Sequence, residues 1–171
     1  LGKPRDSQVK AVFHDLRYAP DGTPRPEFVM NQKGFAGARI VVAERNFACG
    51  SSRENAVTVM VDNGLRAFIA PSFGDIFFNN CFQNAALPVR LEAGRVAEIR
   101  AALHAAPGAR IRIDLASQTV VGPDGRTDRF EIDSFRKDCL LKGVDEVNLT
   151  LGYEAEIAAF ETKQRGEMSW L

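Results

Sequence analysis

A short run of small polar residues followed by one arginine has residue types that suit the binding of an anion. The run is Gly50-Ser51-Ser52-Arg53, followed by Glu54. Gly50 allows the backbone to approach a ligand closely, and Arg53 offers a fork of N–H donors that matches a carboxylate. A helix predicted directly afterwards would present unpaired N–H groups and a partial positive charge at its start. The run therefore predicts a binding site for a carboxylate or a phosphate.

The same residues also allow a purely structural interpretation. Ser51 and Glu54 have the spacing of a capping box, in which Ser51 would be the N-cap of the helix. A hydroxyl group that caps a helix is less free to act as a base. The residues by themselves leave both interpretations open.

Other nucleophilic and metal-binding residues give weaker signals. His14 and His104 fall in a turn-rich start and at a helix end, so no Ser-His-Asp set is evident and we expect ordinary surface or packing roles for both. Together with Cys49, Cys81 and Cys139 they lack zinc or iron–sulfur ligand spacing, so we expect this chain to bind no metal or cofactor itself. An odd number of widely spaced cysteines fits reduced thiols in the cytoplasm or an organellar matrix. We expect Cys49 to be a small buried hydrophobe.

Composition narrows the functional classes. Lys plus Arg and Asp plus Glu both number 22 in 171 residues, which gives a formal net charge of zero. Nucleic-acid binding by neutralisation of phosphates leaves a basic excess that is missing here, so we expect no nucleic-acid partner. Apolar residues form 45% of the chain, which indicates a globular protein. No apolar run approaches the ~20 residues of a membrane helix, so we expect no membrane partner.

The pattern along the chain predicts the elements that position the polar run. Strands and helices alternate from about residue 38, and an Asp-Gly turn later indicates a hairpin. The predicted strands are 38–43, 66–70, 87–91 and 109–115 with a hairpin of 119–121 and 129–132, and the predicted helices are 54–63, 75–84, 94–105, 134–142 and 153–164. Phe73, Phe77, Phe78 and Phe82 predict a helix stripe that faces the core. The fold class is thus α/β, a single compact domain with a parallel strand–helix core, added antiparallel strands and C-terminal helices.

The polar run is part of a longer motif that resembles a known family. Residues 46–56, Asn-Phe-Ala-Cys-Gly-Ser-Ser-Arg-Glu-Asn-Ala, resemble the signature loop of the aconitase swivel domain. They are most similar to the loop in the small subunits of 3-isopropylmalate dehydratase, the isopropylmalate isomerase of leucine biosynthesis. The similarity continues through 64–67, 69–82 and 84–89, through 21–22 with 28–31 before the first strand, and through 135–145 with the terminal helix. It covers most of the chain and implies a swivel-type domain.

The resemblance also implies a reaction and roles for the residues of the loop. Ser51 corresponds to the serine that acts as the base in its alkoxide form, while Ser52 and Arg53, beside Gly50, help to hold a substrate carboxylate. The [4Fe-4S] cluster of such enzymes belongs to a separate large subunit, whose iron binds the departing hydroxyl group. The implied function is the interconversion of 2- and 3-isopropylmalate by dehydration and rehydration. The partners are then a small dicarboxylate substrate and an iron–sulfur large subunit in a cytoplasmic heterodimer, and this chain alone is expected to be inactive.

Two departures from the family pattern keep other functions open. Asn55 stands where the family usually has a histidine. Family members carry an Asp-Thr-Asp stretch and a specificity loop before the matched part, so we expect the Pro-rich residues 1–33 to correspond to the end of that region and 34–171 to form the swivel-type domain. Because substrate choice depends on that loop, a related hydro-lyase subunit acting on homoaconitate or a methyl-substituted malate is one alternative. A non-catalytic anion-binding or assembly subunit is the other.

Overall fold

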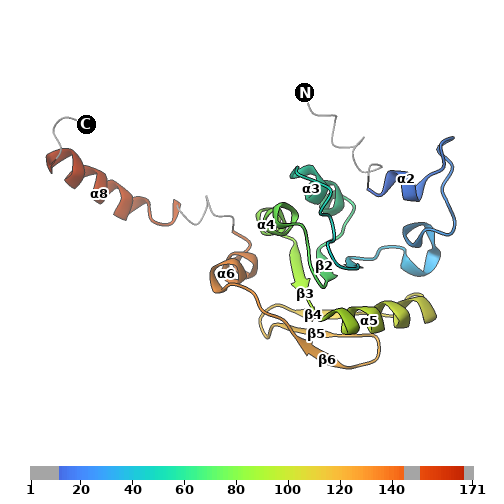
Figure 1. Ribbon diagram of the computed structural model, residues 1–171. Helices are drawn as coiled ribbons and strands as arrows, with labels where there is room; N and C mark the ends of the chain where they lie inside the picture. The colour runs from blue at the N-terminus through green and yellow to red at the C-terminus, as the bar shows by residue number, and fades with distance from the viewer. Residues whose placement is uncertain (1–11, 145–150, 168–171) are drawn as a thin grey trace.

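Three short parallel strands form the centre of the computed structural model, which describes residues 12–144 and 151–167 (Figure 1). They are β1 (Ile40–Val42), β2 (Ala67–Ala70) and β3 (Leu87–Arg90), and they lie in the order β1-β2-β3. Parallel neighbours require a crossover, which α3 (Asn55–Asp62) supplies between β1 and β2 and α4 (Asp75–Gln83) between β2 and β3. The predicted strand–helix alternation is confirmed for all five elements, with ends that differ by one or two residues. All three strands therefore finish at the same edge of the sheet, where the loop 43–54 begins.

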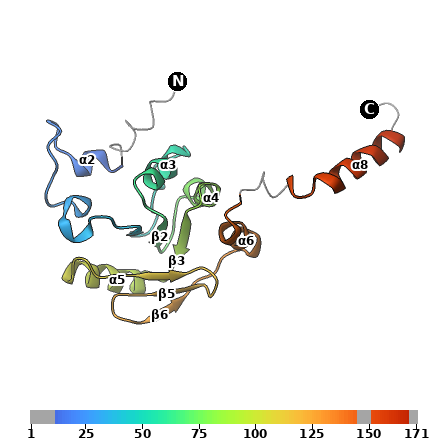
Figure 2. The same cartoon turned by 180° about the vertical axis from the view of Figure 1, so that it is seen from behind.

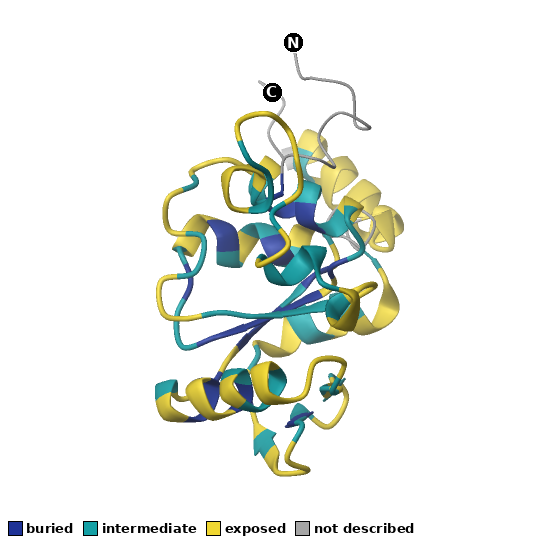
Figure 3. Ribbon diagram, turned by 90° about the vertical axis from the view of Figure 1, so that its right-hand side faces the viewer, coloured by how far each residue is buried: buried dark blue, intermediate teal, exposed yellow. Residues whose placement is uncertain are grey.

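Successive residues of the sheet face two separate apolar clusters. Phe68 and Ala70 pack with Val57 and Phe77 of the two crossover helices on one face. Ile69 packs on the other face, in a second cluster that includes residues of the next helix. Because both faces are covered, β2 is buried along its whole length, as expected for a parallel strand. Figure 3 shows these buried strands between the two helical layers.

The second layer consists of a helix and an antiparallel sheet. Helix α5 (Ala93–Ala105) is followed by β4 (Arg112–Asp114), β5 (Thr119–Val121) and β6 (Thr127–Arg129), paired in that order. The added antiparallel strands are thus confirmed, but the predicted second hairpin arm at 129–132 is wrong. Residues 122–126 close the turn by a hydrogen bond from the Gly122 N–H to the Arg126 carbonyl (3.0 Å), so pairing resumes at once at 127. It ends before Phe130 turns into the core, where this side chain is buried.

Short helices and a long terminal helix complete the described chain. They are α2 (His14–Arg17), η2 (Val29–Asn31) and η3 (Lys33–Phe35) before the sheet, and α6 (Ser134–Lys142) and α8 (Glu154–Glu167) after it. The last two confirm the predicted C-terminal helices, and Figure 2 shows α8 pointing away from the body of the molecule. Residues 1–11 of the predicted N-terminal segment lie outside the described residues. Within the described ranges, no helix combines the length and apolar character that a membrane crossing needs.

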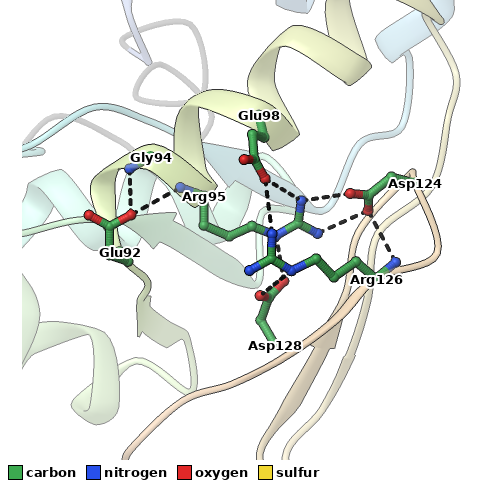
Figure 4. A network of polar contacts seen from close by, with 7 residues as sticks. All are labelled: Glu92, Gly94, Arg95, Glu98, Asp124, Arg126 and Asp128. Carbon is green, nitrogen blue, oxygen red and sulfur yellow. Dashed lines mark hydrogen bonds and ion pairs between the residues drawn. The ribbon is translucent and has the colours of Figure 1, made fainter.

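A buried arginine fastens the antiparallel sheet to α5 (Figure 4). The side chain of Arg95 is 4% exposed, and its guanidinium group contacts three carboxylates: Asp124 at 2.7 Å, Asp128 at 2.6 Å and Glu98 at 3.1 Å. Gly122 makes room for it, because a Cβ atom there would lie 2.5 Å from Arg95 Nη2. The hydrogen bonds from Arg95 lower the pKa of Asp124 from 3.8 to about 2. Arg95 is thereby joined in one charged cluster with Asp124 and Asp128, which lie 29 and 33 positions later in the sequence.

Candidate active site

The Gly50–Arg53 run lies in a loop that follows the carboxyl end of β1. Aromatic packing of Phe47 against the core holds the start of this loop. The ring of Phe47 lies within 6.2 Å of the ring centroids of Phe68, Phe73 and Phe77. The main chain of Phe47 forms an isolated parallel bridge with Phe73 of the β2–α4 turn. The loop therefore starts from a fixed point in the core, at the edge where ligands of open α/β sheets commonly bind.

Ser51 does not cap the following helix, so the capping-box interpretation is wrong. Helix α3 begins at Asn55, its N-cap residue is Glu54, and no side chain caps it. The Ser51 hydroxyl accepts a 3.3 Å hydrogen bond from the Arg53 N–H and donates a 3.4 Å one to the Arg53 carbonyl. Glu54 instead accepts a 3.1 Å hydrogen bond from Asn84 at the end of α4. Ser51 lies three residues before this N-cap position, nearly one turn too early to reach the helix's first amides.

The loop presents an unusual number of open hydrogen-bond donors. The backbone N–H groups of Gly50, Ser52, Glu54 and Asn55 have no acceptor within the described part of the chain. The side chain of Arg53 is exposed, and it forms no ion pair with any described residue. Unpaired amides at the start of a helix and a free guanidinium group both favour an anion. The four predicted site residues thus lie together in one exposed turn whose donors can bind a carboxylate.

Most of the histidines and cysteines lie away from the Gly50–Arg53 run. His14 begins α2 and His104 lies in the last turn of α5, so neither belongs to the loop. Cys49 is exposed, which corrects the expectation that it is a buried hydrophobe. The buried thiol is that of Cys81 on α4, and burial raises its pKa to about 12. Cys49 stays outside the core because the adjacent Phe47 side chain already occupies it.

The predicted aromatic stripe is only half correct. Phe73 and Phe77 are buried, but Phe78 and Phe82 are partly exposed. Arg90 lies 4.0 Å from the centroid of the Phe78 ring, and Arg136 of α6 lies 4.5 Å from that of Phe82. Both rings therefore support cation–π contacts on their outer side, and Phe78 also packs against the edge of the core.

Sequence reasoning missed the residues that hold the loop from the neighbouring turn. Ser72 and Gly74 of the β2–α4 turn contact Asn46 and Phe47 across about 26 positions of sequence. Their position in the sequence could have revealed them, because both follow the predicted strand 66–70. The turns that follow adjacent parallel strands meet at one edge of the sheet. That step was open to sequence reasoning, but the individual hydrogen bonds were not.

Metal binding by the described residues finds no support in the geometry. No three His, Cys, Asp or Glu side chains of residues 12–144 and 151–167 group in a way that could hold a metal ion. An iron–sulfur cluster does not fit the described part of this chain. The open amides and the exposed guanidinium group of the loop are instead groups that suit an anion.

Comparison with known proteins identifies the family. The Aconitase C-terminal domain family matches residues 8–94, and the LeuD_N family matches 97–134. A crystal structure of 3-isopropylmalate dehydratase (leuD) from Methanocaldococcus jannaschii has a TM-score of 0.54 at 24% identity, with 91% of this chain and 90% of that chain covered. At this identity the likeness shows the fold, which is the aconitase-type fold that the sequence predicts.

Bacterial relatives are much closer in sequence. The 3-isopropylmalate dehydratase small subunit of Leptospira interrogans is 48% identical over 162 residues, which cover 94% of this chain and 79% of that protein. The Paramagnetospirillum magneticum protein of the same name is 46% identical, with 95% and 81% covered. Small subunit 1 of Bordetella pertussis is 47% identical, with 98% and 83% covered. The chain belongs to the family of 3-isopropylmalate dehydratase small subunits.

Proposed function

We propose that this chain is the small subunit of a hydro-lyase that interconverts 2- and 3-isopropylmalate in leucine biosynthesis. Its partner in this proposal is a large subunit that carries a [4Fe-4S] cluster, and the pair works as a cytoplasmic heterodimer. The observation that carries the proposal is the exposed Gly50–Arg53 turn, with its open amides and unpaired guanidinium group, in a chain of this family. The assignment of the cluster to the partner is supported by the described residues, among which no three His, Cys, Asp or Glu side chains could hold a metal ion.

Ser51 acts as the base in the proposed reaction. Among the described residues, the hydroxyl group forms hydrogen bonds with Arg53 alone, at 3.3 and 3.4 Å, so it remains free to turn toward a substrate. Its alkoxide form removes a proton from the carbon next to a carboxylate. The C–H electron pair then forms a double bond as the hydroxyl group leaves the neighbouring carbon with its bonding electrons, as hydroxide that the partner's cluster would bind in this proposal. Hydroxide then adds to the carbon that lost the proton, and the proton held by Ser51 returns to the other carbon, which gives the isomer and restores the alkoxide. A guanidinium group and open amides nearby favour the alkoxide, because opposite charge stabilises the charged form.

Gly50, Ser52 and Arg53 bind the substrate carboxylate beside that base. Arg53 can donate two parallel hydrogen bonds to the two oxygens of one carboxylate. The open N–H groups of Gly50 and Ser52 add donors directed at the same anion. These donors also stabilise the negative charge that develops when the proton is removed, and such electrostatic stabilisation commonly contributes more to catalysis than any other single effect.

The test is turnover by the assembled complex. The chain is mixed anaerobically with a cluster-reconstituted large subunit of isopropylmalate dehydratase, and formation of the unsaturated intermediate is followed by its ultraviolet absorbance. We expect activity with isopropylmalate that needs both proteins, and a loss of several powers of ten for Ser51→Ala. Ser117→Ala is the matched control, because Ser117 is an exposed serine on the turn after β4.

Three results would contradict the proposal. Faster turnover of homoaconitate or a methyl-substituted malate would assign the chain to another hydro-lyase. Unchanged turnover of Ser51→Ala would remove the base. A complex that forms on a sizing column without any activity toward these substrates would favour a non-catalytic assembly subunit.

A further inference from the structure

Two loops that are far apart in sequence are joined through one serine hydroxyl group next to the proposed site. The Ser72 Oγ accepts a 2.8 Å hydrogen bond from the Asn46 N–H and donates a 3.0 Å one to Asn46 Oδ1. One side chain thus contacts both the backbone and the side chain of a residue 26 positions earlier. A hydroxyl group has one donor and two acceptor sites. The bond to Asn46 Oδ1 uses its single proton, and the bond from the Asn46 N–H uses one of its acceptor sites.

Asn46 is the residue at which the proposed catalytic loop takes its direction. Its φ angle is 59°, in the left-handed region, and Ala48 repeats this at 58°. Such angles cost energy for residues other than glycine, although asparagine adopts them more readily than most. A conformation of this kind persists where surrounding contacts hold it. The hydroxyl of Ser72 supplies two such contacts at Asn46.

The path from Asn46 to Ser51 consists of two tight turns, of which the first begins at Asn46 itself and spans the anchored Phe47. The Cys49 N–H donates to the Asn46 carbonyl at 3.2 Å, and the Ser51 N–H donates to the Ala48 carbonyl at 3.4 Å. The hydrogen bonds lengthen toward Ser51, whose hydroxyl group makes only long contacts of its own. The position of Ser51 therefore depends on the backbone conformation of Asn46 through these main-chain hydrogen bonds.

Packing of the neighbouring turn leaves little room for another arrangement. A Cβ atom at Gly74 would lie 2.8 Å from the Cys49 Cα atom and 3.0 Å from the Ala48 carbonyl oxygen. Two main-chain hydrogen bonds, from Phe47 N–H to the Ser72 carbonyl (3.0 Å) and from Gly74 N–H to the Phe47 carbonyl (2.9 Å), run beside it. They anchor Phe47 without any side-chain hydroxyl. Because the Asn46 carbonyl accepts a hydrogen bond from the Cys49 N–H, loss of the Ser72 hydroxyl would loosen the turn of residues 46–49 while Phe47 keeps its own contacts.

We infer that Ser72 is a positioning residue for the reaction: its hydroxyl group holds Asn46 in the left-handed conformation from which the loop places Ser51. The inference rests on the proposed role of Ser51. Ser72 lies on the β2–α4 turn and touches neither the proposed base nor the anion-binding donors. Its effect is expected on the turnover number, because displacement of a catalytic group by about 1 Å can cost ~10²-fold in rate.

The test compares Ser72→Ala with Ser72→Thr in the assembled complex. We expect kcat to fall by roughly 10- to 100-fold in Ser72→Ala with a smaller change in KM. Thr retains the hydroxyl group, so Ser72→Thr should recover most of the lost kcat. Ser117→Ala again serves as the control. It removes a hydroxyl group that forms a 2.8 Å hydrogen bond with the Thr119 hydroxyl at the antiparallel sheet, and it should leave kcat unchanged.

A second variant keeps the test valid if Ser72→Ala folds poorly. Asn46→Gly removes the side-chain acceptor but adopts the left-handed conformation without strain. We expect it to lower kcat in the same direction. The double variant Ser72→Ala/Asn46→Gly should be little worse than the more damaging single one, because both changes break the same link.

The outcomes separate this inference from the proposed function. If Ser51→Ala abolishes turnover while Ser72→Ala keeps the parental kcat, the inference fails and the proposed function stands. A kcat loss that Ser72→Thr does not recover, or that equals the loss of folded protein by near-UV circular dichroism, would also overturn it. Full activity of Ser51→Ala would overturn both.

Discussion

Replacement of Arg95 by methionine should destabilise the domain by about 3 kcal/mol, because it leaves a partly buried carboxylate without its main partner. Among the three carboxylates around Arg95, Asp128 is 12% exposed, whereas Glu98 is 59% exposed. Hydrogen bonds to charged groups contribute ~1.5–3 kcal/mol when protected from water, and exposed ion pairs contribute ~1 kcal/mol or less. The 2.6 Å contact with Asp128 therefore dominates the expected loss.

Urea unfolding of the isolated chain measures this loss directly. In a domain of 171 residues, about 3 kcal/mol corresponds to a fall in Tm of roughly 6–12 °C. Methionine retains most of the apolar stem, so the change reports on the guanidinium group. Arg126→Met is the matched control, since Arg126 reaches Glu98 and Asp128 from a position that is 59% exposed, and it should cost ~1 kcal/mol or less.

A double variant examines the proposed cause. If the penalty comes from the uncompensated charge on Asp128, then Asp128→Asn added to Arg95→Met should recover part of the lost stability. The reasoning is refuted if Arg95→Met costs no more than Arg126→Met. It is also refuted if the second change makes the protein still less stable.

Three further predictions concern the carboxylate site, acid stability and thiol reactivity. Arg53→Lys should raise KM in the assembled complex much more than it lowers the free energy of unfolding, because lysine cannot form a two-pronged contact with a carboxylate; an unchanged KM would exclude that contact. Asp124 has a pKa lowered from 3.8 to about 2 by Arg95, so its stabilisation is complete above 3.8 and is lost as the pH falls through about 2. Thermal unfolding across this range should show a shallower acid loss in Asp124→Asn. Maleimide should label Cys49 in the native chain and Cys81 only after unfolding, because Cys49 is exposed while burial raises the pKa of Cys81 to about 12; mass spectrometry of the labelled peptides would contradict this if Cys81 reacted first.

Local patterns were sufficient for most of the elements and for the donor groups of the candidate site. The β-branched run before the loop, the glycine after α3 and the proline after β2 each mark a boundary that backbone sterics impose, whatever the tertiary context. The Gly50–Arg53 run predicts anion binding from residue type alone, which supplies a guanidinium group, hydroxyl groups and a flexible backbone. The family resemblance added the role of Ser51.

Tertiary contacts decided the outcome where the local sequence allowed more than one structure. Ser51 and Glu54 have capping-box spacing, but Asn84 binds Glu54 and the helix starts later. The hairpin register followed from a turn closed at Arg126, and the surface role of Phe78 followed from Arg90 lying over its ring.

The sequence by itself determined the order of strands and helices and the place of the Gly50–Arg53 turn after the first strand. The contacts of Arg95 with two hairpin aspartates and of Ser72 with Asn46 emerged only in the folded chain. The physical reason is range. Backbone propensity and residue chemistry act within a few positions, whereas a hydrogen bond between residues about 30 positions apart depends on how whole elements pack.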